Sequence, residues 1–99
     1  MNVLILGSGG REHAFAWKIA KSSSCSKLFI APGNAGTDEV GINIELNVND
    51  FDKIKEFVLD EEVEIVIVGP EDPLVNGIFD FFSEDEELKH INVIGPSKE

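Results

Sequence analysis

Short apolar runs alternate with amphipathic stretches along the chain. Residues 2–6, 27–30, 64–68 and 91–94 are mostly apolar runs of the length and branched character of buried strands. Residues 42–48 alternate between apolar and polar side chains, which predicts a half-exposed strand. Glycine or proline follows most of these runs, so the pattern predicts a series of strands that end in turns.

Three stretches between the strands have the spacing of helices. The first covers residues 11–21, and the second follows Asn49 or Asp50, either of which can cap it, and continues to about residue 59. The third begins at Asp72-Pro73, an N-cap followed by proline at the first helical position. The apolar residues expected on the buried sides of the three helices are Phe15, Ala16, Ile19 and Ala20; Ile54, Phe57 and Val58; and Leu74, Val75, Ile78, Phe79 and Phe82.

This order of elements predicts an α/β fold. Strands that alternate with helices form a mainly parallel sheet with helices on both faces. The 99 residues suit one domain, 1–99, at the small end of the usual range. In such sheets ligands bind beyond the carboxyl ends of the strands. Three loops that follow predicted strands, residues 7–13, 31–37 and 69–73, should therefore meet at one edge.

Composition excludes several classes of function. Eight basic against 19 acidic residues give a net charge of −11, which disfavours nucleic acid and anionic membranes as partners. No apolar run approaches the ~20 residues of a membrane span, and the N-terminus lacks a basic leader, so we expect a cytoplasmic protein. Cys25 is the only cysteine, and His13 and His90 are the only histidines. We therefore expect neither a disulfide framework nor a zinc cluster.

The first loop, Gly-Ser-Gly-Gly-Arg-Glu-His, has the character of a phosphate site. Glycines let backbone N–H groups approach a ligand, and the N-terminus of the following helix carries partial positive charge. The alternative is a tight turn with no ligand. Glu12 occupies the third glycine position of the dinucleotide fingerprint, which disfavours NAD and FAD. No Gly-Lys-Ser/Thr follows either, so a small phosphorylated molecule is the remaining ligand class.

The candidate binding residues lie in the three loops, and no catalytic residue or metal ligand is predicted. Arg11 is a candidate to pair with the phosphate, the alternative being a solvated residue at a helix start. Asp72 already serves as an N-cap, whereas Glu71 has no structural role and is the better candidate to contact a ligand hydroxyl or amine. His13 has no nucleophilic partner in the pattern. The predicted binding residues are Gly7, Ser8, Gly9, Gly10, Arg11, Gly33, Asn34, Gly36, Glu71 and Asp72.

Four segments together resemble one enzyme family. They are Gly-Ser-Gly-Gly-Arg-Glu-His-Ala at 7–14, Ala-Pro-Gly-Asn-Ala-Gly-Thr at 31–37, Val-Gly-Pro-Glu-Asp-Pro-Leu-Val at 68–75 and Ile-Gly-Pro-Ser-Lys at 94–98. In this order and spacing they resemble the N-terminal domain of phosphoribosylamine–glycine ligases, also called glycinamide ribonucleotide synthetases. The resemblance covers the whole chain.

The resemblance implies an ATP-grasp ligase of de novo purine biosynthesis. In that family ATP and magnesium (or manganese) support the joining of glycine to 5-phosphoribosylamine. The first domain is a Rossmann-like preATP-grasp fold that supplies part of the phosphoribosylamine site. By the same resemblance, the glycine loop fits the sugar phosphate, and Glu71 is placed like the acid that meets the ribose or the amine.

The chain departs from the family in length. A segment like residues 95–98 leads into the ATP-grasp domain in the family, whereas this sequence stops at Glu99. We expect the ATP-grasp and C-terminal domains, with the ATP and metal sites, to lie outside this chain, which by itself should be monomeric, inactive and without a bound cofactor. Two other classes stay open: a stand-alone module that binds a sugar phosphate or nucleotide, and an acidic interaction domain. The reading frame beyond Glu99 would distinguish them.

Overall fold

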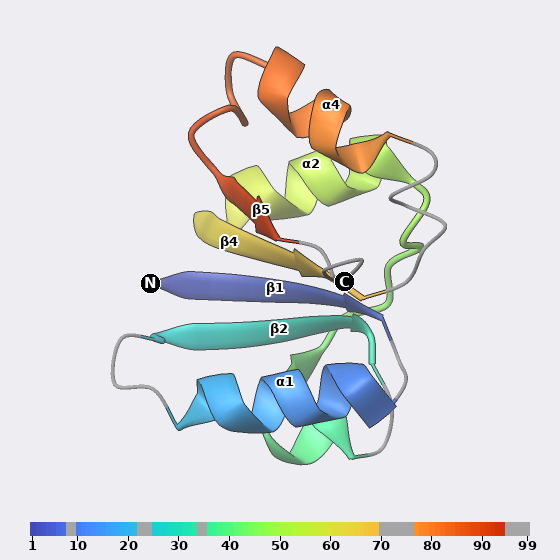
Figure 1. Ribbon diagram of the computed structural model, residues 1–99, viewed down its shortest axis with the longest axis vertical. Coiled ribbons are helices and arrows are strands. Elements are labelled where there is room, and N and C mark those ends of the chain that lie inside the picture. Colours follow the sequence, from blue (N-terminus) through green and yellow to red (C-terminus); the bar gives the residue numbers. More distant parts are fainter. Residues whose placement is uncertain (8–9, 22–24, 34–35, 70–76, 95–99) are drawn as a thin grey trace, which may run out of the picture.

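The computed structural model describes residues 1–7, 10–21, 25–33, 36–69 and 77–94, and for residues 10–13, 15 and 38 it describes the backbone alone. Strands and helices alternate along these residues (Figure 1). The strands are β1 (Asn2–Gly7), β2 (Lys27–Pro32), β3 (Ile42–Asn43), β4 (Val63–Val68) and β5 (Asn92–Ile94). The helices are α1 (Gly10–Ala20), α2 (Phe51–Asp60) and α4 (Ile78–Glu84), with a 3-10 helix, η1, over Thr37–Glu39.

The described strands form one sheet in the order β3-β2-β1-β4-β5, and each neighbouring pair is parallel. The central strand is β1, in which Leu6 lies opposite Ala31 of β2 on one side and Val68 of β4 on the other. Parallel sheets are covered on both faces, so their inner strands are continuously apolar. The sequence of β1 follows this rule, and the predicted α/β class with a mainly parallel sheet is confirmed.

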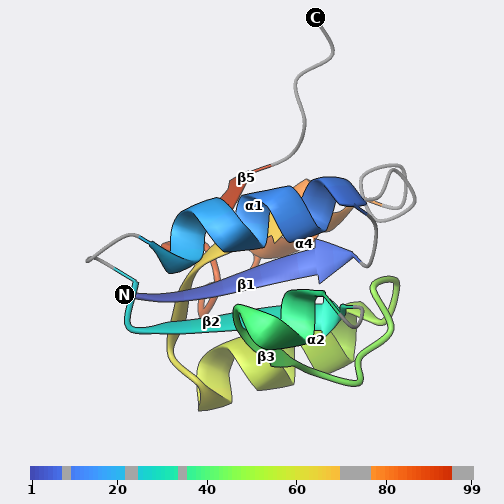
Figure 2. The same ribbon diagram turned by 90° about the horizontal axis from the view of Figure 1, so that it is seen from below.

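Helices pack on both faces of the sheet, as predicted. Figure 1 shows α2 and α4 side by side, with α1 across the strands from them, and Figure 2 shows α1 and α2 on opposite sides of β1 and β2. The larger core contains the alternate strand residues Leu4, Leu6, Phe29, Ala31, Val66 and Val68 and the helix residues Ile54, Val58, Ile78 and Phe82. The smaller core, on the other face, contains Val3, Ile5, Leu28 and Ile30 with Ala16 of α1.

Most helix and strand predictions agree with the structure. Asp50 caps α2, because its Oδ1 accepts a hydrogen bond from the Lys53 backbone N–H at 3.2 Å. The helix predicted from Asp72 is described only from Ile78 onward, since residues 70–76 lie outside the described ranges. Two of the apolar residues expected on buried helix faces are exposed, namely Ala20 on α1 and Phe79 on α4. Within the described ranges, no helix is both long and apolar enough to cross a membrane.

The predicted strand over residues 42–48 is wrong in length. Only Ile42 and Asn43 pair with β2, and the Ile44 N–H adds one more bond to the carbonyl of Ile30, at 2.8 Å. Farther on, the Asn47 side chain accepts a hydrogen bond from the Asn49 backbone at 2.8 Å and closes a turn in place of a ladder. The alternation predicted burial only in part, because Ile42 is 49% exposed whereas the later apolar residues of the stretch are partly buried. Three of its apolar residues pack against the larger core: Ile44, Leu46 and Val48.

An ion-pair cluster joins α2 to the segment after α4. The Lys55 Nζ lies 2.7 Å from Asp85 Oδ2 and 3.3 Å from Glu87 Oε1. The hydrogen bond from Lys55 holds the pKa of Asp85 below its ordinary value, and a second bond, from the Glu87 backbone N–H, acts in the same direction. The same carboxylates raise the pKa of Lys55. The cluster therefore stabilises the fold while Asp85 is ionised.

We predict that Asp85→Asn lowers the free energy of unfolding at neutral pH and that the loss disappears in acid. A carboxyl whose pKa is depressed by folding stabilises the protein above its unfolded pKa, and this contribution is lost as pH falls through the folded pKa. Urea unfolding at a series of pH values from neutral to acid measures the difference. Glu86→Gln is the control, because the Glu86 side chain is 87% exposed and its ion pair with Lys89 lies at the surface. A difference that persists unchanged in acid would contradict the assignment.

Candidate functional site

The carboxyl ends of the three inner strands meet at one edge of the sheet, as the sequence predicted for the loops that follow them. Gly7 at the end of β1 lies opposite Pro32 at the end of β2. Hydrogen bonds extend this contact beyond the strands: the Gly33 N–H donates to the Gly7 carbonyl at 3.0 Å, and the Gly69 N–H donates to the Leu6 carbonyl at 3.1 Å. The first residues of all three predicted loops are therefore held together by the backbone.

The first loop places the N-terminus of a helix at the centre of this edge. Gly7 has φ = 138°, a conformation that favours glycine, and α1 begins at Gly10, with only two residues between it and the end of β1. The first N–H groups of an α-helix have no partner inside the helix, and they carry partial positive charge. Arg11 lies in this first turn, as predicted, and its side chain is outside the description. The arrangement suits an anion bound by backbone donors.

The second loop is fixed to β3 by a partly buried side-chain hydrogen bond. Thr37 is completely buried, and its Oγ1 donates to Asn43 Oδ1 at 2.8 Å. Gly33, with φ = 76°, packs against this pair so closely that a Cβ would lie 2.8 Å from Thr37 Oγ1 and would overlap the Asn43 side chain. Gly36 precedes η1, and its carbonyl accepts a hydrogen bond from the Glu39 N–H at 3.2 Å. We call Gly33, Thr37 and Asn43 the loop clamp.

Sequence reasoning did not find the loop clamp. Gly33 and Gly36 were predicted as ligand-contacting residues, whereas the structure also gives Gly33 a packing role. Asn43 occupies an ordinary polar position in an alternating stretch, and no spacing in the sequence links it to residues 33–37. The signal that connects them is the pairing of β3 with β2, which tertiary structure supplies.

Half of the predicted binding residues lie outside the described part of the chain. Gly7, Gly10, Arg11, Gly33 and Gly36 are placed at the carboxyl edge, at least by their backbone. Nothing is described for the other predicted residues, which are Ser8, Gly9, Asn34, Glu71 and Asp72. The described residues at this edge offer backbone donors and a rigid turn, which is chemistry for binding rather than for proton transfer.

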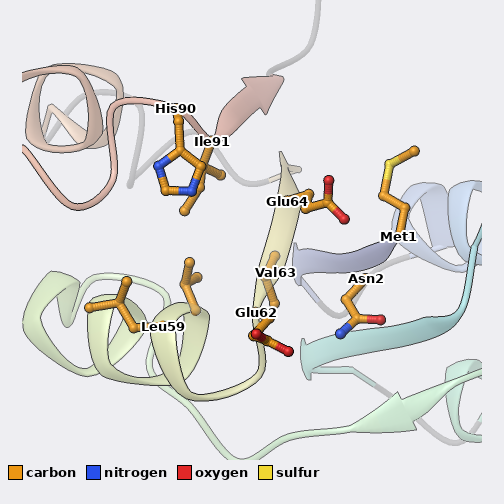
Figure 3. Close-up of a pocket in the computed structure, with 9 residues that line it drawn as sticks. Met1, Asn2, Leu59, Glu62, Val63, Glu64, His90 and Ile91 are labelled. Atoms are coloured by element: carbon orange, nitrogen blue, oxygen red, sulfur yellow. The ribbon is translucent and has the colours of Figure 1, made fainter.

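A hollow of about 540 Å³ lies at the opposite edge of the sheet (Figure 3). It is formed where β1 and β4 begin and where the chain enters β5, and Glu62, Glu64 and His90 are the acidic and imidazole side chains on its wall. Among the side chains that the structure describes, no group of three His, Cys, Asp or Glu residues could hold a metal ion. Because open parallel sheets bind ligands at the carboxyl ends of their strands, we assign the candidate site to the glycine edge instead.

Comparisons with known proteins agree with the resemblance seen in the sequence. A family model described as "Phosphoribosylglycinamide synthetase, N domain" matches residues 1–99. A phosphoribosylamine–glycine ligase of Mesorhizobium japonicum is 48% identical over 98 residues, and one of Haemophilus influenzae is 44% identical over 100 residues. Each match covers 99% of this chain and 22% of the relative, so the chain spans about a fifth of the length of these relatives.

A solved structure is similar as well. The crystal structure of phosphoribosylamine–glycine ligase from Thermotoga maritima matches with a TM-score of 0.54 and 35% sequence identity. The match covers 74% of this chain and 16% of that chain.

We predict that Gly33→Ala destabilises the domain more than Gly77→Ala does. Both glycines have positive φ, so alanine costs about 1–2 kcal/mol of backbone strain at either position. At Gly77 a Cβ meets no atom of the described residues within 4 Å, whereas at Gly33 it meets Thr37 and Asn43. The difference between the two variants in urea unfolding therefore measures the packing of the loop clamp. Equal losses of stability would show that the clamp is loose enough to accept a methyl group.

Proposed function

The chain belongs to the phosphoribosylglycinamide synthetase N-domain family, and on this premise we propose that it acts as the N-terminal domain of a phosphoribosylamine–glycine ligase. The activity belongs to a longer polypeptide, of which this domain is about a fifth. In that reaction ATP phosphorylates the carboxylate of glycine, and the amine of 5-phosphoribosylamine attacks the acyl phosphate. Glycinamide ribonucleotide, ADP and phosphate are the products.

We propose that this domain binds the sugar phosphate of 5-phosphoribosylamine at the glycine edge. The observation that carries the proposal is the start of α1 at Gly10, directly beyond the carboxyl end of the central strand. A helix N-terminus there offers N–H donors and about half a unit of positive charge to a phosphate. The chain has a net charge of −11, so a phosphate would bind only where a local source of positive potential offsets the repulsion. In this proposal the N-terminus of α1 is that source.

The predicted binding residues take distinct roles in this proposal. Gly7, Gly9 and Gly10, with Ser8 between them, form a backbone cradle in which the glycines have no side chains to hold the phosphate away, and Arg11 adds a charge-assisted contact. Gly33, Asn34 and Gly36 form a wall that the loop clamp fixes in place. Glu71 and Asp72, on the third loop, face the ribose hydroxyls or the amine.

ATP and its magnesium (or manganese) ion bind, in this proposal, to the remainder of the ligase. The described residues do not supply a metal-ligand set, and the first loop lacks the Gly-Lys-Ser/Thr sequence of a nucleotide P-loop. This domain therefore contributes binding and orientation of one substrate. The net charge of −11 supports the further proposal that nucleic acids and anionic membranes are not partners.

We predict that Arg11→Ala in the full-length enzyme weakens use of 5-phosphoribosylamine roughly ten- to a hundred-fold. A charge-assisted hydrogen bond to a phosphate contributes on the order of 1.5–3 kcal/mol. Steady-state kinetics with each substrate varied in turn should show the loss in kcat/KM for 5-phosphoribosylamine and little change for ATP or glycine. Lys18→Ala is the matched control, since it removes a positive charge from the last turn of the same helix. An unchanged phosphoribosylamine dependence would return Arg11 to an ordinary solvated position.

We predict the same substrate selectivity for Glu71→Gln. This change keeps the shape of the side chain and removes the charge that would meet an amine or a hydroxyl. The loss should again appear in the phosphoribosylamine dependence measured by steady-state kinetics. Glu86→Gln, which alters an exposed carboxylate outside the three loops, should leave all three substrate dependences unchanged. A Glu71→Gln enzyme that loses ATP affinity instead would place this loop at the nucleotide.

A further inference from the structure

The sheet has an apolar groove on the face that carries α1. Its volume is about 210 Å³, and none of the described side chains that line it is charged. The groove extends across β1, β4 and β5, with α1 along one wall. Its lining residues are Met1, Val3, Ile19, Cys25, Ile65, Ile67 and Ile94.

The groove exists because the described helices cover the two faces unequally. Both α2 and α4 pack on the other face, whereas α1 packs its Ala16 against β1 and β2. On β4 the consequence is visible residue by residue: Val66 and Val68 are buried, while the intervening Ile65 and Ile67, which face the groove, are only partly buried. At the rim, Met1 is 42% exposed and Ile94 is 50% exposed. An inner strand of a parallel sheet normally has both faces covered.

Two observations indicate what covers this face. Ile94 is the last residue of β5 and is itself part of the groove wall, so the polypeptide leaves the sheet at the rim of the groove. The relatives are between four and five times as long as the part that matches this chain, which covers 22% of their length. A segment that continues from β5 therefore begins beside an apolar surface that the described helices leave exposed to solvent.

Charge disfavours a second copy of this chain as the cover. Each copy carries a net charge of −11, and two such copies repel one another. A segment of the same polypeptide has no such penalty of association, because its attachment at β5 gives it a high effective concentration at the groove.

We propose that this groove is the docking surface for a segment of the ligase polypeptide that follows this domain, and that apolar side chains of that segment complete the helical layer over β4 and β5. The proposal rests on membership of the family and on the geometry of the groove. It is independent of the proposed phosphoribosylamine site, so either can fail without the other. Its chemistry is purely apolar, in contrast to the polar glycine edge.

Cys25 provides a reporter for the test. It is the only cysteine of this chain, it lies on the groove wall, and partial burial raises the pKa of its thiol. In the full-length protein, alkylation by N-ethylmaleimide can be followed at Cys25 by peptide mass spectrometry. A covered groove should slow this reaction at least about tenfold relative to the urea-unfolded protein, and Ile94→Lys should restore most of the lost reactivity.

Phe79→Lys is the matched control, since Phe79 is 41% exposed and lies on α4, which packs on the other face of the sheet. It should leave Cys25 protected. Circular dichroism confirms that each variant remains folded, and Ile94→Leu should retain protection if the contact is apolar. Rapid alkylation of Cys25 in the folded wild-type protein would overturn the proposal. Protection that depends on protein concentration, together with a dimer in light scattering, would also overturn it and identify a second copy as the cover.

Discussion

The burial of the central strand β1 is the constraint on which the rest of the domain depends. Leu4, Ile5 and Leu6 are completely buried, so both faces of the strand must be covered, and β2 and β4 must pair with its two edges. Because all three strands run in the same direction, this arrangement brings their carboxyl ends to one edge. Gly7 then lies between the loops that follow β2 and β4, and α1 has to start there in order to return over the sheet.

A strongly acidic domain with a site for an anion must rely on short-range interactions. At physiological ionic strength charges are screened over roughly 8 Å, so the many surface carboxylates have little influence on a ligand that is already in contact with backbone donors. The same carboxylates act on larger polyanions, which meet many of them at once. On the proposed assignment, the combination of an acidic surface with a helix N-terminus at the glycine edge favours small phosphorylated molecules over polymers.

Local chemistry determines which features the sequence could predict. The runs of β1, β2 and β4, the N-cap Asp50 and the change from strand to helix between Gly7 and Gly10 all have causes within a few residues, and they agree with the structure. The strand over 42–48 was too long because alternation reports burial, and Asn47 supplies a competing turn. The Thr37–Asn43 hydrogen bond could not be predicted, because it depends on the pairing of β3 with β2. The partial exposure of one face of β4 could not be predicted either, because it depends on where the helices pack on the sheet. The roles of Ser8, Gly9, Asn34, Glu71 and Asp72 stay predictions.

The order of the strands also has a kinetic consequence. At the centre of the sheet β1 pairs with β4, so residues 2–6 lie beside residues 63–68, which are far away in the sequence. The other neighbour of β1 is β2, which is much nearer to it in the sequence. Closing so long a loop has an entropic cost that must be met before the pairing stabilises anything, and parallel pairings of this kind fold slowly. The pair of β1 and β2 with α1 is local and can form first, which leaves the backbone N–H and C=O groups of one edge of β1 without a strand partner. This order of pairings predicts that the docking of β4 onto that edge limits the rate of folding.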